Sequence, residues 1–211
     1  MKSIGLIGFG ALGRQILSLL QAVDRPDEVV FFDDIAYAER RENSLPFNRF
    51  LDDRFSGYDY YLALGYRHLT LKAQIVNKLL AAGRRVPSLI HPSCHVHPSC
   101  RIGDGCVLYP QCNLDQEVEL KPAVLLNNSV VISHNSILGT AVYCSPGVVL
   151  SGNVTIGEAS FLGTGTLVSN NRHIGARSRI AIGTVVSRNV PDDASAIGNP
   201  LRLLDQQLRL E

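Results

Sequence analysis

Tryptophan is absent from this chain, methionine occurs once, and the charges nearly cancel, at +1 over 211 residues. This balance gives no support for a nucleic-acid-binding protein, which carries a basic surface. Because no run of about 18 apolar residues occurs, no segment is expected to span a membrane. The N-terminal sequence lacks the small-residue cleavage site that ends a signal peptide. Cysteine is scarce and odd in number, at five, which indicates reduced thiols. These features predict a globular cytoplasmic protein.

The second half of the chain is an internal repeat. An aliphatic residue stands at every sixth position from Ile90 to Val186, seventeen positions in all, with Cys144 as the one exception. Four places after each of them stands a small or β-branched residue, except at Arg172. A period of six fits neither a helix nor a simple strand. It predicts a hexapeptide parallel β-helix whose three short faces form a coil of eighteen residues. Residues eighteen apart are then stacked neighbours, about 4.8 Å from each other.

The first half is predicted to be a small α/β unit. Residues 3–9, 28–32 and 59–64 have the composition of buried strands. One helical pattern follows residues 3–9, and another, over residues 69–82, follows residues 59–64. Strands that alternate with helices indicate a parallel sheet.

The predicted organisation therefore has three parts. Residues 1–88 form a Rossmann-like sugar- or nucleotide-binding subdomain, residues 89–191 the β-helix, and residues 192–211 a C-terminal turn and capping helix. The helix is expected because Leu201, Leu204 and Leu208 have the spacing of one helix face.

A glycine-rich motif follows the first predicted strand. Gly8, Gly10 and Gly13 have the spacing GxGxxG, and Asp33 follows about twenty residues later, which formally satisfies the dinucleotide fingerprint. Glycines let the backbone approach a phosphate, and a helix N-terminus favours an anion. Three interpretations stay open: a tight turn without a ligand, a nucleotide or nucleotide-sugar phosphate site, and an NAD site. The last is disfavoured because a full dinucleotide domain has two such halves.

Most histidines and cysteines have structural explanations. Three histidines cluster at the first coils, namely His91, His95 and His97, but they fall on different faces or corners, so no metal site is expected. His68 and His173 are expected at the surface. Four cysteines occupy the small inward position, where a thiol acts as a small apolar group: Cys94, Cys100, Cys106 and Cys112. Among these, only Cys94 and Cys112 are eighteen residues apart.

His134 is the candidate for chemistry. It stands at the third place of its hexad, on an outer corner, and the stacked position one coil later is Gly152. A glycine there leaves a notch and exposes a backbone N–H. A thioester carbonyl in this notch would have an imidazole general base on one side and an oxyanion donor on the other.

At these residues the chain resembles a known family. A short glycine-rich α/β domain, the hexads, the corner at Ser133–Asn135, the segment 151–157 (SGNVTIG) and the segment 198–202 (GNPLR) are similar to bacterial acetyltransferases that modify sialic acids and nucleotide-linked amino sugars. The resemblance implies a left-handed β-helix and transfer of an acetyl group from acetyl-CoA to a sugar amine or hydroxyl. It also implies a homotrimer in which neighbouring subunits share each site.

The resemblance assigns roles to individual residues. The base falls on His134, the oxyanion glycine on Gly152, and Asn135 follows the base. The CoA contacts fall on Tyr143, Gly152, Thr164 and Ile182. The sugar-nucleotide contacts fall on Gly10, Ala11, Leu12, Asp33, Asp34, Gly65 and Asn127.

The chain departs from the family pattern at three places. Asn135 stands where an acidic residue usually follows the base, Leu12 lies in a loop that usually carries a histidine, and Tyr143 replaces a histidine. Two alternatives to the enzyme are a non-catalytic trimeric scaffold that binds sugar nucleotides and an NAD-binding protein. Trimerisation is expected because the flat outer faces carry apolar residues, namely Val131, Val149, Phe161 and Leu167.

Overall fold

The computed structural model of the chain describes residues 2–23 and 25–209. The chain divides into two compact units, Met1–Pro87 and Ser88–Glu211. In the described part of the chain, no helix combines the length and the apolar composition needed to cross a lipid bilayer.

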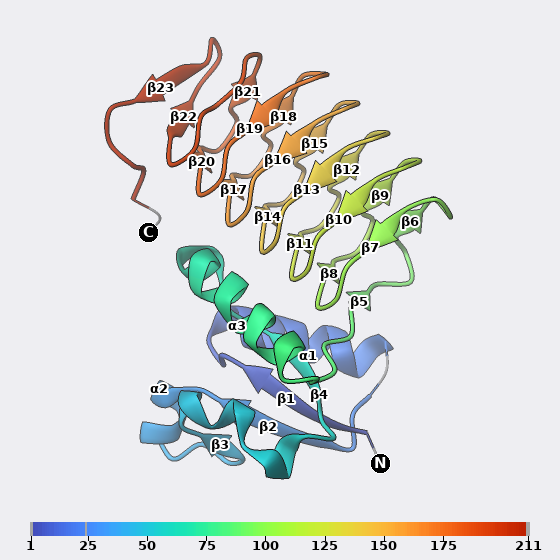
Figure 1. The fold of residues 1–211 in the computed structure, drawn as a ribbon, viewed down its shortest axis with the longest axis vertical. Coiled ribbons are helices and arrows are strands. Elements are labelled where there is room, and N and C mark those ends of the chain that lie inside the picture. Colours follow the sequence, from blue (N-terminus) through green and yellow to red (C-terminus); the bar gives the residue numbers. More distant parts are fainter. Residues whose placement is uncertain (1, 24, 210–211) are drawn as a thin grey trace. The chain divides into compact units, whose positions relative to one another are not determined.

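The first unit is built on a four-stranded parallel sheet in the order β3-β2-β1-β4 (Figure 1). Its strands are β1 (Ser3–Ile7), β2 (Glu28–Phe32), β3 (Ser44–Leu45) and β4 (Asp59–Leu62). Its helices are α1 (Ala11–Val23), α2 (Asp34–Ala38) and α3 (Leu69–Ala81), with three short 3₁₀ helices at Phe47–Leu51, Asp53–Phe55 and Tyr66–His68. The three expected strands and two expected helices are all present. The short elements β3 and α2 were not expected from the sequence.

The second unit is a β-solenoid of seventeen two-residue strands. They are β5 (Leu89–Ile90), β6 (His95–Val96), β7 (Arg101–Ile102), β8 (Val107–Leu108), β9 (Asn113–Leu114), β10 (Glu119–Leu120), β11 (Leu125–Leu126), β12 (Val131–Ile132), β13 (Ile137–Leu138), β14 (Tyr143–Cys144), β15 (Val149–Leu150), β16 (Thr155–Ile156), β17 (Phe161–Leu162), β18 (Leu167–Val168), β19 (His173–Ile174), β20 (Arg179–Ile180) and β21 (Val185–Val186). Each strand ends on a residue of the predicted hexad series, which confirms the period of six.

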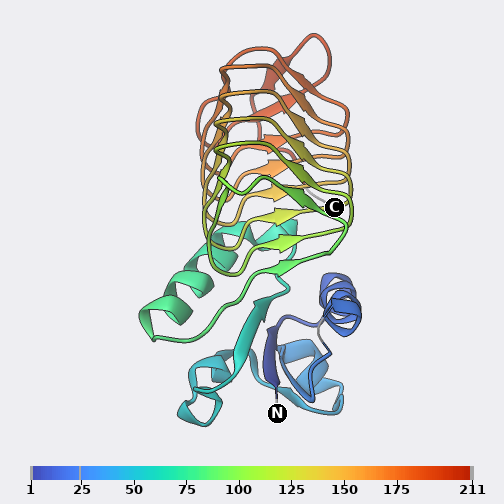
Figure 2. The ribbon, with the colours of Figure 1, turned by 90° about the vertical axis from the view of Figure 1, so that its right-hand side faces the viewer.

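The strands form three parallel sheets, one for each face of the coil (Figures 1 and 2). Partners in a sheet are eighteen residues apart, as in the pairing of Val131 with Val149 and of Ile132 with Leu150. The predicted stacking rule is therefore confirmed. The interior is a continuous apolar core of hexad residues and of the small residues four places later.

The solenoid ends in a hairpin, so the predicted C-terminal capping helix is wrong. Strand β22 (Ser195–Ile197) pairs in parallel with β20, and β23 (Arg202–Leu204) pairs antiparallel with β22. The last coil presents an open sheet edge with unpaired backbone groups, and added strands satisfy those groups where a helix would not. Of the three leucines that suggested the helix, Leu201 is buried against the core.

Candidate active site

The backbone of one solenoid corner fixes the position of His134. This corner joins β12 to β13, and Asn135 adopts the left-handed conformation there, with φ of 58°. Asparagine tolerates this conformation better than most residues. The Asn135 N–H donates to the carbonyl of Gln116 one coil earlier (3.0 Å), and the Asn153 N–H donates to the carbonyl of His134 (2.9 Å). The corner is thus bonded to the coils on both sides of it.

The His134 imidazole fills the notch over Gly152. A β-carbon added to Gly152 would lie 2.5 Å from both Cε1 and Nε2 of His134. No side chain fits at that distance, so a glycine at position 152 is what lets the ring lie there. The eighteen-residue spacing therefore brings these two residues together as expected.

Asn135 determines which ring nitrogen of His134 carries the proton. The Oδ1 atom of Asn135 lies 3.0 Å from Nδ1 of His134. A carbonyl oxygen only accepts hydrogen bonds, so Nδ1 is the donor and the neutral ring keeps its lone pair on Nε2. Nε2 is also the nitrogen that lies at Gly152. An amide at position 135 orients the base without supplying the negative charge of a carboxylate.

The Gly152 N–H was expected from the sequence to be an exposed donor without a partner, but it already makes a hydrogen bond. It donates to Oδ1 of Asn170, at 2.9 Å. Asn170 lies one coil later at the same corner and is exposed. Asn170 could not be singled out beforehand, because the hexad pattern does not indicate the direction of a corner side chain.

Apart from Gly152, the residues assigned to CoA lie on other parts of the solenoid. Thr164 and Ile182 are exposed at the corners that follow β17 and β20, and Asn127 lies at the equivalent corner after β11. Tyr143 lies on β14 and is buried, and its hydroxyl accepts a hydrogen bond from Nδ2 of Asn127 (3.4 Å). Within one chain, these residues are therefore not gathered around His134 and Gly152.

One sheet separates the two groups of residues. The six-stranded sheet β21-β18-β15-β12-β9-β6 has the corners of Thr164 and Ile182 before its strands and the corner of His134 after them. Its outer face carries a row of aliphatic residues at stacked positions: Val131, Val149, Leu167 and Val185. Leu167 is 46% exposed and Val131 36% exposed.

A second group of predicted residues surrounds a cavity in the first unit. The cavity has a volume of about 450 Å³, and five of the six predicted residues from this unit line it: Gly10, Ala11, Leu12, Asp33 and Gly65. It lies where β1, β2 and β4 end, the edge of an open parallel sheet at which ligands bind. Asp34 does not line it.

The three glycines of the motif differ in backbone conformation and in surroundings. Gly8 has a φ of +93°, which favours glycine, and a β-carbon on Gly13 would lie 2.7 Å from the carbonyl oxygen of Gly8. A β-carbon on Gly10 would have no atom within 4 Å. Gly8 and Gly13 are thus required by the fold, whereas Gly10 leaves bare backbone facing open space.

Both acidic residues after β2 accept hydrogen bonds from backbone N–H groups. Asp33 accepts from the Phe9 N–H (2.8 Å) and from the Ala36 N–H at the start of α2 (2.8 Å). Asp34 accepts from the Phe47 N–H, also at 2.8 Å. Asp33 therefore ties the glycine-rich loop to α2, a role that sequence analysis did not assign.

Five lining residues of the cavity were not predicted from the sequence, namely the apolar Ala63 and Leu64 before Gly65 and three polar residues after it. Tyr66, Arg67 and His68 follow Gly65 and line it, and His68 was expected to be merely a surface residue. His68 is exposed as expected, but it faces the same cavity as the motif. A run of polar side chains directly after a predicted strand was the available signal. Arg67 gives the cavity a positive charge.

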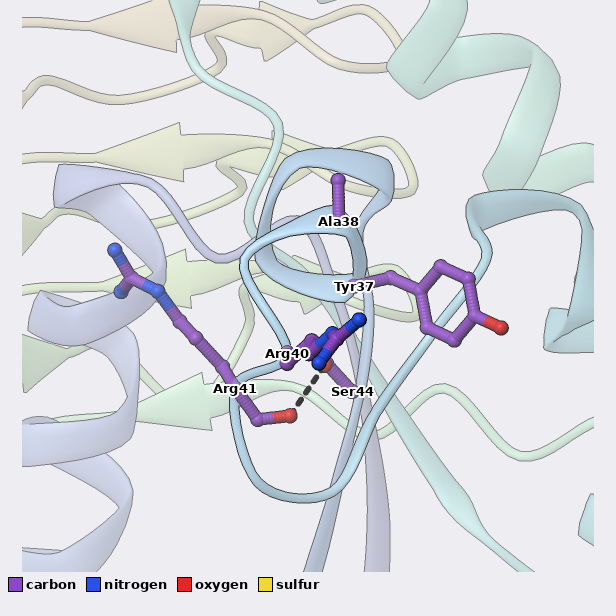
Figure 3. A pocket seen from close by; sticks show the side chains of 5 residues that line it. All are labelled: Tyr37, Ala38, Arg40, Arg41 and Ser44. Atoms are coloured by element: carbon purple, nitrogen blue, oxygen red, sulfur yellow. Dashed lines mark hydrogen bonds between the residues drawn. The ribbon is translucent and has the colours of Figure 1, made fainter.

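A further cavity of about 410 Å³ in this unit contains none of the predicted residues. Its lining is Tyr37, Ala38, Arg40, Arg41 and Ser44 (Figure 3). Arg41 forms an ion pair with Glu39 (2.7 Å) and lies over the ring of Phe9, 5.7 Å from its centroid. Because Arg41 already has these partners, this cavity is the weaker candidate for an anion.

The cysteines and histidines form no metal cluster in the part of the chain that the structure describes. The five cysteines are free thiols, and three of them, Cys106, Cys112 and Cys144, are buried. Cys94 and Cys112 interact across one coil step, and a hydrogen bond from Cys112 lowers the pKa of Cys94 to about 7.

Comparison with known proteins gives a consistent set of structural neighbours. No protein-family model matches the chain, and no curated protein matches it. The acetyltransferase domain of PglB from Neisseria gonorrhoeae, in complex with acetyl coenzyme A, is 29% identical, with a TM-score of 0.86 over 96% of this chain and 99% of that chain. PerB from Caulobacter crescentus, in complex with CoA and GDP-perosamine, is 26% identical, with a TM-score of 0.84 over 97% of each chain.

A third neighbour extends the same fold to lower identity. WeeI from Acinetobacter baumannii is 20% identical, with a TM-score of 0.85 over 97% of this chain and 100% of that chain. The matches cover both units of the chain. The first of these neighbours is an acetyltransferase domain and the second was solved with CoA and GDP-perosamine, which confirms the resemblance that the sequence indicates, whereas the third shows the fold alone.

Proposed function

We propose that this chain is an acetyl-CoA-dependent acetyltransferase that acetylates the amine of a nucleotide-linked amino sugar. The observation that carries the proposal is the imidazole of His134 in the notch over Gly152, with Asn135 on Nδ1 and the lone pair on Nε2. The neighbours support it, because PglB was solved with acetyl coenzyme A and PerB with CoA and GDP-perosamine.

In the proposed reaction, the acceptor nitrogen attacks the thioester carbonyl of acetyl-CoA. Nε2 of His134 takes a proton from that nitrogen, and the Gly152 N–H donates to the oxyanion of the tetrahedral intermediate. The carbon–sulfur bond then breaks, and the imidazolium returns the proton to the CoA sulfur. The products are the N-acetyl sugar and CoA, and no covalent enzyme intermediate is needed.

The cavity of the first unit is proposed to hold the nucleotide part of the acceptor. We infer a Rossmann-like half-domain here, since the order β3-β2-β1-β4 corresponds to part of that sheet. The bare backbone at Gly10 and the N-terminus of α1 would bind phosphate oxygens. Arg67 would add a cation, and Asp33 would hold the loop in place. An NAD-binding domain would need a second half that the sheet does not have.

A homotrimer is proposed to complete the site. The residues assigned to acetyl-CoA and the His134 corner flank one sheet with an exposed aliphatic face. If these faces pack together, the Thr164 corner of one protomer approaches the His134 corner of its partner. We further infer that the winding is left-handed, as the resemblance implies. A cytoplasmic location would fit both the free thiols and the supply of acetyl-CoA.

The test is thiol release from acetyl-CoA in the presence of GDP- and UDP-linked amino sugars, with the product identified by mass spectrometry. His134→Ala should lower turnover by about 10²- to 10⁴-fold. His173→Ala is the matched control, because His173 is an exposed histidine of the same solenoid on β19. A wild-type protein that binds these ligands without releasing thiol would be a scaffold instead. Undiminished turnover in His134→Ala would refute the assigned base.

A further inference from the structure

The corner above the candidate base holds a hydrogen bond that the proposed reaction has to break. The Gly152 N–H, the proposed oxyanion donor, is occupied by Oδ1 of Asn170 at 2.9 Å. At two other corners, the N–H at the equivalent place donates to the residue directly before it: Gln116 to Asp115 (2.7 Å) and Asn128 to Asn127 (2.8 Å). At another such corner, the Ala176 N–H donates to Asp192 of the next coil (2.9 Å). At Gly152 the acceptor comes from eighteen residues later, so it is not part of the turn itself.

The oxygen that holds this N–H and the oxygen expected to replace it are both carbonyl oxygens. Oδ1 of Asn170 is a carbonyl oxygen of a primary amide, and the group that acetyl-CoA would place on this N–H is the carbonyl oxygen of a thioester. Both accept one hydrogen bond from the same donor, so they compete for it. Asn170 is exposed. Its side chain can therefore rotate into water, where its amide regains hydrogen bonds, without leaving a cavity in the core.

We infer that Asn170 is a positioning residue that occupies the oxyanion donor in the free enzyme and gives it up to the thioester carbonyl. This inference rests on the proposed function. CoA has no acyl carbonyl, so it does not compete with Asn170 for the N–H. The residue therefore lowers the affinity for acetyl-CoA relative to CoA.

The test compares the affinities of acetyl-CoA and CoA in two variants that act in opposite directions. In Asn170→Ala the N–H is free, and acetyl-CoA should bind about 2- to 10-fold more tightly, the factor that corresponds to one neutral hydrogen bond. Asn170→Asp has the same shape but a charged acceptor, which holds an N–H about twice as strongly, so acetyl-CoA should bind more weakly. CoA carries the same phosphates as acetyl-CoA, so the ratio of the two affinities removes general charge effects.

Steady-state kinetics should show the same opposite effects of the two variants. The KM for acetyl-CoA should fall in Asn170→Ala and rise in Asn170→Asp, while the KM for the acceptor stays constant, because the competition occurs before the chemical step. Asn189→Ala is the matched control. Its side chain also accepts from a backbone N–H, that of His173 at 3.0 Å, but at a different place.

The possible results separate this inference from the proposed function. Wild-type protein that binds neither acetyl-CoA nor CoA would refute the proposed function. Wild-type binding together with an unchanged affinity ratio in both variants would overturn the role of Asn170 alone. So would a loss of kcat in Asn170→Ala at constant acetyl-CoA affinity, because Asn170 would then be acting on the transition state.

Discussion

The Nδ1 atom of His134 lies 3.0 Å from Oδ1 of Asn135, its neighbour in the chain. This contact places the lone pair of the neutral ring on Nε2, the nitrogen at the notch. Asparagine has two reasons to occupy position 135, since it also adopts the left-handed conformation of the corner. An amide and a carboxylate at this place should differ in their effect on the proposed base.

The first prediction concerns Asn135. Asn135→Ala should lower kcat, because both tautomers then become populated, but by less than the roughly 10²- to 10⁴-fold that a complete general base contributes. In Asn135→Asp the carboxylate accepts from the same Nδ1–H and stabilises the imidazolium that forms during the reaction, so kcat should not fall. Thiol-release kinetics of both variants would test this, and equal losses of kcat in the two would contradict it.

A second prediction follows from the glycine below the ring. In Gly152→Ala the new methyl carbon would overlap the imidazole at 2.5 Å, so the ring must leave the notch. Turnover should fall by at least about 10²-fold, the lower limit for loss of a general base. The free energy of unfolding should change by no more than about 1 kcal/mol, because the end of a partly exposed side chain moves and the core does not.

Gly57→Ala is the matched control for this substitution. Its β-carbon would have no atom within 4 Å, so neither turnover nor stability should change much. Thiol-release kinetics and urea unfolding of both variants give the two readouts. Full turnover in Gly152→Ala would show that the ring does not need the notch.

The stacked pairs of the solenoid were predictable from the sequence because the core enforces the period. Every hexad residue must point inward to be buried, so a single slip would expose all later ones. That constraint reaches the corner, and it is why His134 and Gly152 could be paired at eighteen residues. The small inward residues follow the same rule, since Ser136, for example, accepts from the stacked Val154 N–H at 3.1 Å.

The remaining features depend on local conformations that the six-residue period does not determine. The bond from Gly152 to Asn170 depends on the rotamer of an exposed side chain. The C-terminal hairpin has leucines at helical spacing, but the open sheet edge of the last coil decided its conformation. Arg67 and His68 line the first unit's cavity because of the way the chain turns after β4, and no periodic pattern marks such a turn.

A third prediction separates the two acidic residues after β2. Asp33→Ala removes acceptors from the Phe9 and Ala36 N–H groups, and it should destabilise the protein by about 2 kcal/mol, one for the helix cap and one for the loop bond. It should also raise the KM for the sugar nucleotide, because the glycine-rich loop loses its anchor. Asp34→Asn keeps an oxygen for the Phe47 N–H and should change both quantities little. Urea unfolding and acceptor titrations would test the pair, and equal effects of both variants would contradict the assignment.

The fourth prediction concerns thiol reactivity. The hydrogen bond from Cys112 lowers the pKa of Cys94 to about 7, whereas burial raises the pKa of Cys144 to about 12. The thiolate is the nucleophile, so iodoacetamide should alkylate Cys94 first, at a rate that rises as the pH passes through about 7. Peptide mass spectrometry of timed reactions would follow each site. Cys112→Val removes the donor and should slow the reaction at Cys94 at pH 7. An unchanged rate would show that the bond does not act on the thiolate.

The last prediction tests whether neighbouring protomers share the site. Leu167 and Ile137 are aliphatic residues of the same solenoid with similar exposure, 46% and 38%, but they lie on different sheets, on β18 and β13. Leu167→Asp places a carboxylate in the proposed trimer face, where its burial is costly, so the protein should sediment as a monomer and lose thiol release. Ile137→Asp should remain a trimer with normal turnover.

Mixed trimers would extend this test to the chemistry. Two separate variants are needed. His134→Ala lacks the base at one corner, and Thr164→Trp carries a bulky side chain that would block the acetyl-CoA corner. If each site combines the two corners from different subunits, unfolding and refolding an equal mixture of these inactive variants should restore part of the activity. That recovery requires sites that contain neither substitution, and such sites arise only across a subunit boundary. A mixture that stays inactive while forming trimers would place the whole site within one chain.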